Sequence, residues 1–176
     1  MKKMIFAMIF ACAACFATTP FEALKQMEGT VMAGGKCVAY DDATGKACRR
    51  KANGTWNCKG TPTIGYGETS KSIVGKGSIT VKEAEKLLKK RIEELEGTVA
   101  STIKVPLTNG QKTALICFAY NVGKNAFETS TLVKLLNQGK YSEVPAQLRR
   151  WVYSGGKVND GLKNRREAEI NIWNEK

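Results

Sequence analysis

Glu28 and Asp42 are the two residues whose types and positions could perform chemistry together. Glu28 ends a short segment with helical apolar spacing, and Asp42 opens a region rich in glycine and β-formers. Cleavage of a glycosidic bond uses two carboxyl groups, one that protonates the leaving oxygen and one that attacks the sugar or orients water. On residue type alone, a turn cap at Glu28 and an Asx-turn at Asp42 are the more common roles.

The absence of histidine narrows the chemistry further. A Ser-His-Asp triad, a Cys-His pair and a histidine zinc site are excluded, so acid–base work falls to carboxylates, Lys, Tyr or Cys. The 176 residues suit one domain and carry 28 Lys and Arg against 16 Asp and Glu, a formal net charge of +12. This excess favours a polyanionic partner such as nucleic acid, an anionic membrane surface or an acidic cell wall.

Residues 1–17 form a separate segment. Two lysines precede an unbroken apolar run from Met4 to Phe16, which is shorter than the roughly 20 residues of a membrane-spanning helix. The pattern is typical of a secretory signal peptide cleaved after Ala17. The alternatives are a retained membrane anchor and a buried N-terminal helix, while lipoprotein processing at Cys15 lacks the usual branched residue before it.

Four cysteines remain when this leader is removed: Cys37, Cys48, Cys58 and Cys117. An even number suits disulfides in an oxidising, exported setting. We expect Cys48 to pair with Cys58, because the Asn53-Gly54 turn between them can fold the segment into a hairpin. Cys37 and Cys117 would then form the second disulfide. A zinc site is the alternative, although no Cys-x-x-Cys pair lies beyond the leader.

The elements that position the two carboxylates follow from apolar periodicity and turn residues. Apolar spacing predicts a short helix over 21–27, closed by Glu28-Gly29. Frequent glycines between short runs of β-formers predict a small antiparallel sheet within residues 34–67. A capping box, Thr80-Val81-Lys82-Glu83, opens a long predicted helix, and a second, Thr108 to Gln111, opens an apolar one.

Three more helices are expected around residues 132–137, 142–152 and 161–173. The predicted fold class is α+β, with residues 18–176 as one catalytic domain. Its parts are a small antiparallel β lobe over about 29–79, a connecting helix over about 80–101 and a larger helical lobe over about 102–176. A cleft between such lobes is a usual place for an extended substrate.

Six motifs then occur in the order in which one known family has them. They are Glu28-Gly29, Tyr40-x-Asp42, Thr63-Ile64-Gly65-Tyr66-Gly67, Phe118-Ala119-Tyr120-Asn121-Val122-Gly123, Arg149-Arg150-Trp151 and Gly161-Leu162-x-x-Arg165-Arg166-x-x-Glu169. Together they resemble the phage-type lysozymes, glycoside hydrolase family 24, especially endolysins of the lambdoid kind. The resemblance covers essentially all of the chain after residue 17. No single motif is specific for the family, but six of them in the same order are.

The resemblance implies a lysozyme-like fold and hydrolysis of the β-1,4 bond between N-acetylmuramic acid and N-acetylglucosamine in bacterial peptidoglycan, with no metal or other cofactor. By position, Glu28 matches the general acid, and Asp42 and Thr63 match the residues that hold the attacking water. The family is usually inverting, and the carboxyl groups of an inverting pair stand roughly 6.5–9.5 Å apart. Three further residues fall where the family contacts sugar, although packing or turn roles explain each equally well: Thr69, Tyr120 and Ser130.

Three charged neighbours have two interpretations each. Asp41 competes with Asp42, and the Tyr-x-Asp spacing favours Asp42. Arg165 matches an arginine that holds the acid through a charge-assisted hydrogen bond, or it forms a helix-surface ion pair with Glu169. Glu68 stands where the family commonly has histidine. It would repel the ionised aspartate and help to keep the acid protonated, or it is a solvated turn residue.

The stretches from Glu28 to Tyr40 and from Asp42 to Thr63 are longer than is typical and contain three of the cysteines. We therefore expect a disulfide-pinned extension beside the cleft. Some relatives have a weakly hydrophobic N-terminal segment that first tethers the enzyme and later releases it into the periplasm. Cys12 and Cys15 suggest a redox version, in which one of them pairs with Cys37 while the enzyme is tethered.

The leading prediction is an exported, monomeric peptidoglycan hydrolase, periplasmic or secreted, that meets the membrane only transiently through its N-terminal segment. A non-catalytic wall-binding protein is the second possibility, and retention of Glu28, Asp42 and Thr63 together argues against it. A lytic transglycosylase is the nearest enzyme alternative and would leave anhydro-muramic ends. Nucleic-acid binding is not expected, because no predicted helix concentrates basic residues on one face.

Overall fold

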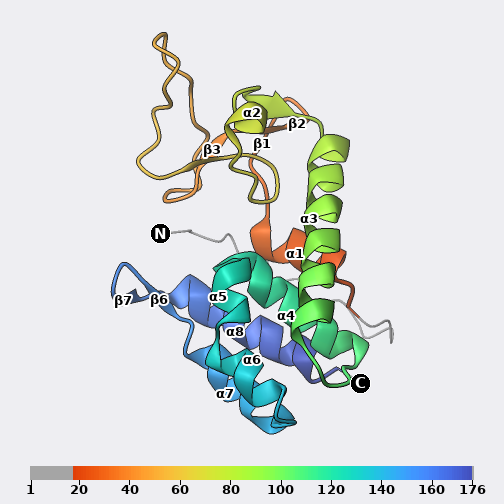
Figure 1. Cartoon of the computed structure of the whole chain (residues 1–176). Helices are drawn as coiled ribbons and strands as arrows, with labels where there is room; N and C mark the ends of the chain where they lie inside the picture. The colour runs from red at the N-terminus through yellow and green to blue at the C-terminus, as the bar shows by residue number, and fades with distance from the viewer. Residues whose placement is uncertain (1–17, 176) are drawn as a thin grey trace, which may run out of the picture. The chain divides into compact units, whose positions relative to one another are not determined.

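A computed structural model describes residues 18–175, which divide into two compact units (Figure 1). The first unit comprises residues 24–90, and the second comprises residues 18–23 and 91–175. Helices of 4 to 22 residues and small antiparallel sheets confirm the α+β class. Within residues 18–175, no helix is both long enough and apolar enough to cross a bilayer.

The candidate acid lies at the end of helix α1 (Pro20–Glu28). Pro20 suits a first helical position, because its missing amide hydrogen would have no partner there in any case. Leu24 and Met27 are buried, as the apolar spacing predicted. Gly29 follows with a φ of +60°, a left-handed conformation that glycine adopts at little cost, and it ends the helix. The predicted helix over 21–27 is confirmed.

Two small antiparallel sheets form the β part of the first unit. One has the order β1 (Met32–Ala33), β2 (Lys36–Val38), β5 (Ser78–Ile79), and the other pairs β3 (Tyr40–Asp41) with β4 (Pro62–Thr63). The register of the second sheet puts Tyr40 opposite Thr63 and Asp41 opposite Pro62. The predicted antiparallel sheet is confirmed, although its strands are short and a brief helix, α2 (Lys71–Val74), was not predicted.

Residues 43–61, here called the arm, connect β3 to β4 and form the long orange-to-yellow loop of Figure 1. A Cys48–Cys58 disulfide closes the arm, which confirms the predicted pairing. The second predicted disulfide is wrong, because Cys37 carries a free thiol. Cys37 is buried on β2 in the first unit, whereas Cys117 is buried on α4 (Asn109–Val122) in the second. Cys12, Cys15 and the proposed leader lie outside the described residues.

Helix α3 (Val81–Thr102) contributes residues to both units. Its N-terminus has the predicted capping box: the Thr80 amide donates to Glu83 Oε2 at 2.8 Å, and the Glu83 amide donates to Thr80 Oγ1 at 3.1 Å. Such reciprocal bonds satisfy amides that have no partner at a helix start. The predicted helix over about 80–101 is therefore confirmed nearly to the residue.

The second unit is helical apart from one small hairpin. After α4 come α5 (Lys124–Glu128), α6 (Thr131–Leu136), η1 (Tyr141–Glu143), α7 (Val144–Arg149), β6 (Tyr153–Ser154), β7 (Lys157–Val158) and α8 (Asp160–Trp173). The capping box at Thr108 and Gln111 is present, and α4 supplies much of the core through residues 113–119. The predicted helices at 132–137 and 161–173 are confirmed as α6 and α8.

The predicted helix over 142–152 is too long at both ends. Proline fits only the first turn of an α-helix, because it lacks the amide hydrogen needed further along. Pro145 accordingly lies in the first turn of α7, and the residues before that helix form the 3-10 turn η1. The chain leaves the helix before Trp151, whose ring packs edge-on against Phe118 with centroids 5.3 Å apart.

Candidate functional site

Asp42 directly follows β3, and its carboxylate is held in place by the backbone of the facing segment. The Thr61 amide donates to Asp42 Oδ1 at 2.7 Å, and the Asp42 amide donates to the Thr61 carbonyl at 3.2 Å. A carboxylate that accepts a backbone amide is oriented without a long, flexible partner. Asp42 is only half-buried, so it is both oriented and reachable from solvent.

Thr63 lies beside this group on β4 and is buried. Its hydroxyl donates to the Thr61 carbonyl at 3.1 Å, so the donor of this side chain is used within its own segment. A hydroxyl also has two acceptor lone pairs. What Thr63 can offer a water molecule is therefore an acceptor.

Tyr40 is a buried phenol on β3, next to the candidate site. It is buried opposite Thr63, and burial raises the pKa of its phenol far above the ordinary value. The negative charges of Glu28 and Asp42 raise this pKa further, so both carboxylates lie within electrostatic range of one phenol. Tyr40 stays protonated at neutral pH and is a hydrogen-bond donor in this neighbourhood. The sequence marked Tyr40 only as part of the Tyr-x-Asp spacing.

Asp41 has a different role from its neighbour. Its buried carboxylate accepts the amides of Lys59 at 2.9 Å, Ala43 at 3.0 Å and Gly60 at 3.0 Å. The Lys59 amide is the largest cause lowering the pKa of this carboxyl, burial opposes the shift, and the other two amides add to it. Asp41 thus closes the base of the arm, which favours Asp42 as the carboxylate available for chemistry.

Gly60→Ala is expected to lower the free energy of unfolding by about 1–3 kcal/mol, the usual cost of overpacking. A Cβ at this position would lie 2.2 Å from Asp42 Oδ1 and 2.9 Å from Asp41 Oδ1, so both carboxylates would have to move. Urea denaturation measures the change.

Gly97→Ala is the matched control. Gly97 lies on α3, and an added Cβ there would meet nothing within 4 Å apart from the helix's own backbone. Replacing a helical glycine should raise stability by about 0.5–1 kcal/mol. Equal effects of the two substitutions would contradict the close packing at Gly60.

Glu68 and Thr69 lie in the turn after β4. The Glu68 backbone pairs with Ile64 in both directions, at 2.9 and 3.1 Å, and its Oε1 accepts the Ser70 amide at 2.6 Å. Glu68 therefore acts as a turn residue just before α2, while Thr69 is exposed. The effect of the Glu68 charge on Glu28 and Asp42 stays a prediction.

Tyr120 and Ser130 belong to the second unit. Tyr120 is half-buried on α4. Ser130 is buried and caps α6, where its Oγ accepts the Val133 amide at 3.2 Å. The sequence allowed Ser130 a local structural role in place of a sugar contact, and capping α6 is such a role. Sugar contacts by Tyr120 and Ser130 stay predictions.

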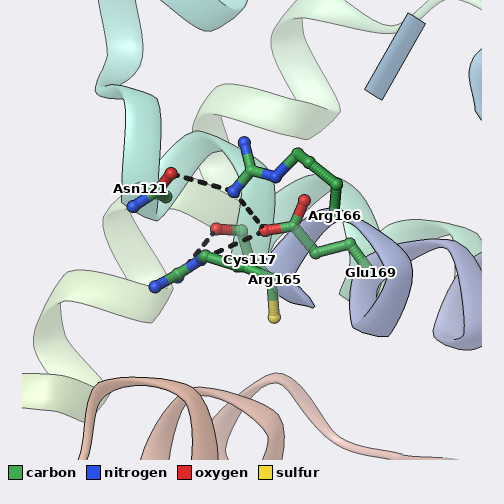
Figure 2. A network of polar contacts seen from close by, with 5 residues as sticks. All are labelled: Cys117, Asn121, Arg165, Arg166 and Glu169. Atoms are coloured by element: carbon green, nitrogen blue, oxygen red, sulfur yellow. Dashed lines mark hydrogen bonds and ion pairs between the residues drawn. The ribbon is translucent and has the colours of Figure 1, made fainter. Parts of the chain in front are cut away.

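Arg165 forms the ion pair with Glu169 that its spacing on α8 predicted, but in the interior instead of on the surface (Figure 2). Its Nε donates to Glu169 Oε1 at 3.2 Å, and its Nη2 donates to the Cys117 carbonyl at 3.3 Å. Both side chains are at most 1% exposed. Arg165 thus joins α8 to α4, and the contact with the acid that the family implies stays a prediction.

Arg166 completes this buried network. Its Nη2 donates to the same Glu169 Oε1 and to Asn121 Oδ1, each at 2.8 Å, and its guanidinium lies 5.1 Å from the centroid of the Phe118 ring (Figure 2). Burial lowers the pKa of Arg166 to about 10, and the adjacent Glu169 carboxylate opposes this shift. Two buried cations therefore share one carboxylate oxygen.

Comparisons with known proteins agree on one family. The family model described as phage lysozyme matches residues 25–169. The endolysin of Bacillus phage PZA is 41% identical over 112 residues, which cover 64% of this chain and 43% of that protein. The SAR-endolysin of Bacteriophage PS119 is 40% identical over 113 residues, covering 64% of this chain and 68% of that protein. The chain thus spans less than half of the PZA endolysin.

Solved structures agree with the sequence relatives. The endolysin from Escherichia coli O157:H7 phage FAHEc1 is 30% identical with a TM-score of 0.67, covering 89% of this chain and 90% of that one. The muramidase domain of SpmX from Asticaccaulis excentricus is 25% identical with a TM-score of 0.67, covering 88% of this chain and 94% of that one. The predicted lysozyme-like fold is confirmed. Since the family match covers most of its residues, the chain belongs to the phage lysozyme family.

Proposed function

We propose that this chain is an endo-acting N-acetylmuramidase, which hydrolyses the β-1,4 bond between N-acetylmuramic acid and N-acetylglucosamine in peptidoglycan and so lyses bacteria. One arrangement carries the proposal: Thr61 holds both the Asp42 carboxylate and the Thr63 hydroxyl, and Thr63 pairs across strands with the buried Tyr40, whose pKa the negative charges of Glu28 and Asp42 both raise. Membership of the phage lysozyme family and relatives named endolysin support it. So does the likeness to a protein named as a muramidase domain.

In this mechanism Glu28 is the general acid. It donates its proton to the glycosidic oxygen as the bond to the leaving sugar breaks, so that the leaving group departs as a neutral alcohol. Glu28 is half-buried at the last position of α1, where the rigid helix fixes its Cα. The left-handed Gly29 turns the chain away immediately afterwards.

Asp42 and Thr63 hold the water that attacks from the opposite face of the sugar. The Asp42 carboxylate accepts one proton of this water and orients a lone pair toward the anomeric carbon, as in an inverting hydrolase. Thr63 accepts a second hydrogen bond from the water, since its own hydroxyl hydrogen is donated to Thr61. The Tyr40 phenol, which burial keeps protonated, supplies a neutral donor opposite Thr63.

Asp42→Asn is expected to slow the lysis of a peptidoglycan suspension by about 10²- to 10⁴-fold with little change in stability, because the amide is a poor base. Asp41→Asn should instead lower the melting temperature, because an amide replaces the carboxylate that accepts three backbone amides. Turbidity loss and thermal unfolding of both oxidised proteins check this pair. A folded Asp41→Asn protein that is inactive beside an active Asp42→Asn protein would reverse the assignment.

The remaining parts of the proposal concern binding and export. Residues 18–176 would be the catalytic domain, exported to the periplasm or outside the cell as a monomer behind the leader of residues 1–17. Sugar contacts would come from Thr69, Tyr120 and Ser130. Failure of the oxidised protein to clear a peptidoglycan suspension would favour the alternative, a non-catalytic wall-binding protein.

A further inference from the structure

The arm carries an unbalanced positive charge. It contains Lys46, Arg49, Arg50, Lys51 and Lys59 and no acidic residue. All five side chains are exposed, and among residues 18–175 none of them takes part in an ion pair. This one loop therefore contributes +5 to the net charge of +12.

The backbone of the arm is fixed although its side chains are exposed. The Cys48–Cys58 disulfide closes the hairpin, and inside it Arg50 forms an antiparallel bridge with Trp56. The Trp56 ring packs toward Gly77, where an added Cβ would lie 4.0 Å from its Cη2. A ligand that binds the basic side chains would thus meet a preorganised backbone, which lowers the entropy cost of binding.

The base of the arm is bonded directly to the two aspartates. The Lys59 and Gly60 amides donate to Asp41, and the Thr61 amide donates to Asp42. From Asp42 to the tip near Asn53, an extended chain reaches at most about 36 Å, at roughly 3.3 Å per residue. Anything held by the arm is therefore within about 36 Å of Asp42, and both lie in the first unit.

We infer that the arm binds the carboxylates of the stem peptides attached to the glycan strand that the enzyme cleaves, an inference that rests on the proposed function. These carboxylates are the anionic groups repeated along peptidoglycan. Arginine binds carboxylates through paired donors, and lysine adds point charge. The stem peptides are covalently attached to the glycan, and the arm begins next to Asp42, the residue proposed to hold the attacking water. A single substrate could therefore reach both.

An anionic membrane surface fits the arm less well. Peripheral membrane binding combines basic residues with apolar side chains that enter the interface. The exposed large hydrophobic residues of the described chain are Met32, Tyr153 and Val158, and none of them lies on the arm. The one large apolar side chain of the arm, Trp56, is half-buried.

The test compares two triple variants with the same loss of charge. The arm variant is Lys46→Gln/Arg49→Gln/Lys51→Gln, whose side chains make no hydrogen bond among residues 18–175. The control is Lys82→Gln/Lys86→Gln/Lys90→Gln on the exposed face of α3 in the same unit. Both also carry Glu28→Gln, so that the glycan stays intact while binding is measured, and circular dichroism checks that each is folded.

Binding is measured by sedimentation with peptidoglycan freed of other wall polymers, before and after an amidase removes its stem peptides. At low salt, the Glu28→Gln protein with its arm intact should bind the peptide-bearing form about tenfold more tightly than the peptide-free form. Three exposed ion pairs together supply about this difference in binding free energy. The arm variant should lose this preference and the control should keep it. The preference should shrink at high salt, where surface charges are screened.

Retention of the preference by the arm variant would overturn the inference. So would tighter arm-dependent binding to duplex DNA, or to vesicles containing phosphatidylglycerol, than to peptide-bearing peptidoglycan. Hydrolysis of the peptide-free glycan, measured with Glu28 intact, separates the two proposals. The arm variant should cleave this glycan at the rate of the unaltered protein. If the unaltered protein cleaves neither this glycan nor peptide-bearing peptidoglycan, the proposed function fails, whatever the arm binds.

Discussion

Glu28→Gln is expected to slow peptidoglycan lysis by about 10²- to 10⁴-fold, the usual contribution of a general acid. Glutamine has nearly the same shape but no acidic proton, so the leaving sugar would depart as an unstable alkoxide. The free energy of unfolding should change by less than about 0.5 kcal/mol, because the position is only partly buried and the change is nearly isosteric. Turbidity loss and urea denaturation measure the two quantities.

Glu93→Gln provides the control for this substitution. It makes the same chemical change on the exposed face of α3 and should leave lysis unchanged. A Glu28→Gln protein that retained lysis within about threefold of the parent would remove Glu28 from the mechanism, since a missing general acid costs at least about 10².

Glu169→Gln is expected to lower the free energy of unfolding by about 3–5 kcal/mol, the usual cost of removing one partner from a buried charge network. The Glu169 side chain is 0% exposed, and its Oε1 accepts from both Arg165 and Arg166. Without its negative charge, two buried guanidinium groups would repel each other between α4 and α8. Urea denaturation of the oxidised protein measures the loss.

Glu167→Gln, two residues earlier on the same helix, is the matched control. Glu167 pairs with Arg149 at 2.7 Å, but both side chains are about half exposed. Exposed ion pairs contribute roughly 0.2–1 kcal/mol, so this variant should be nearly as stable as the parent. If the two substitutions cost the same, the buried network would not be a stabilising centre of the second unit.

The helices were predictable where local chemistry determines them. Both capping boxes, at Thr80 and Thr108, involve bonds between residues three apart, so four letters of sequence reveal a helix start. The 3-10 turn before α7 and the five-residue α5 are too short to give a periodic signal. The Cys37–Cys117 disulfide was wrongly predicted because pairing depends on tertiary contacts that cysteine counting does not contain.

The candidate site was predictable only in part. The order of the motifs pointed to Glu28, Asp42 and Thr63, but not to the different roles of Asp41 and Asp42. That difference arises because the amides of residues 59–61 come back to meet β3, a contact between segments about 18 positions apart. The run of cations without an acidic residue in the arm was visible in the sequence, and the structure adds that they are exposed on a pinned hairpin.

The proposed muramidase activity is tested most directly by digesting purified peptidoglycan in water enriched in ¹⁸O and analysing the fragments by mass spectrometry. Hydrolysis adds one water across each broken bond. Muramidase activity should give fragments that end in reducing N-acetylmuramic acid, each carrying one ¹⁸O from the solvent. Unlabelled anhydro-muramic ends would instead identify a lytic transglycosylase, and labelled reducing ends on N-acetylglucosamine would identify the wrong bond. Either result would contradict the roles proposed for Glu28, Asp42 and Thr63.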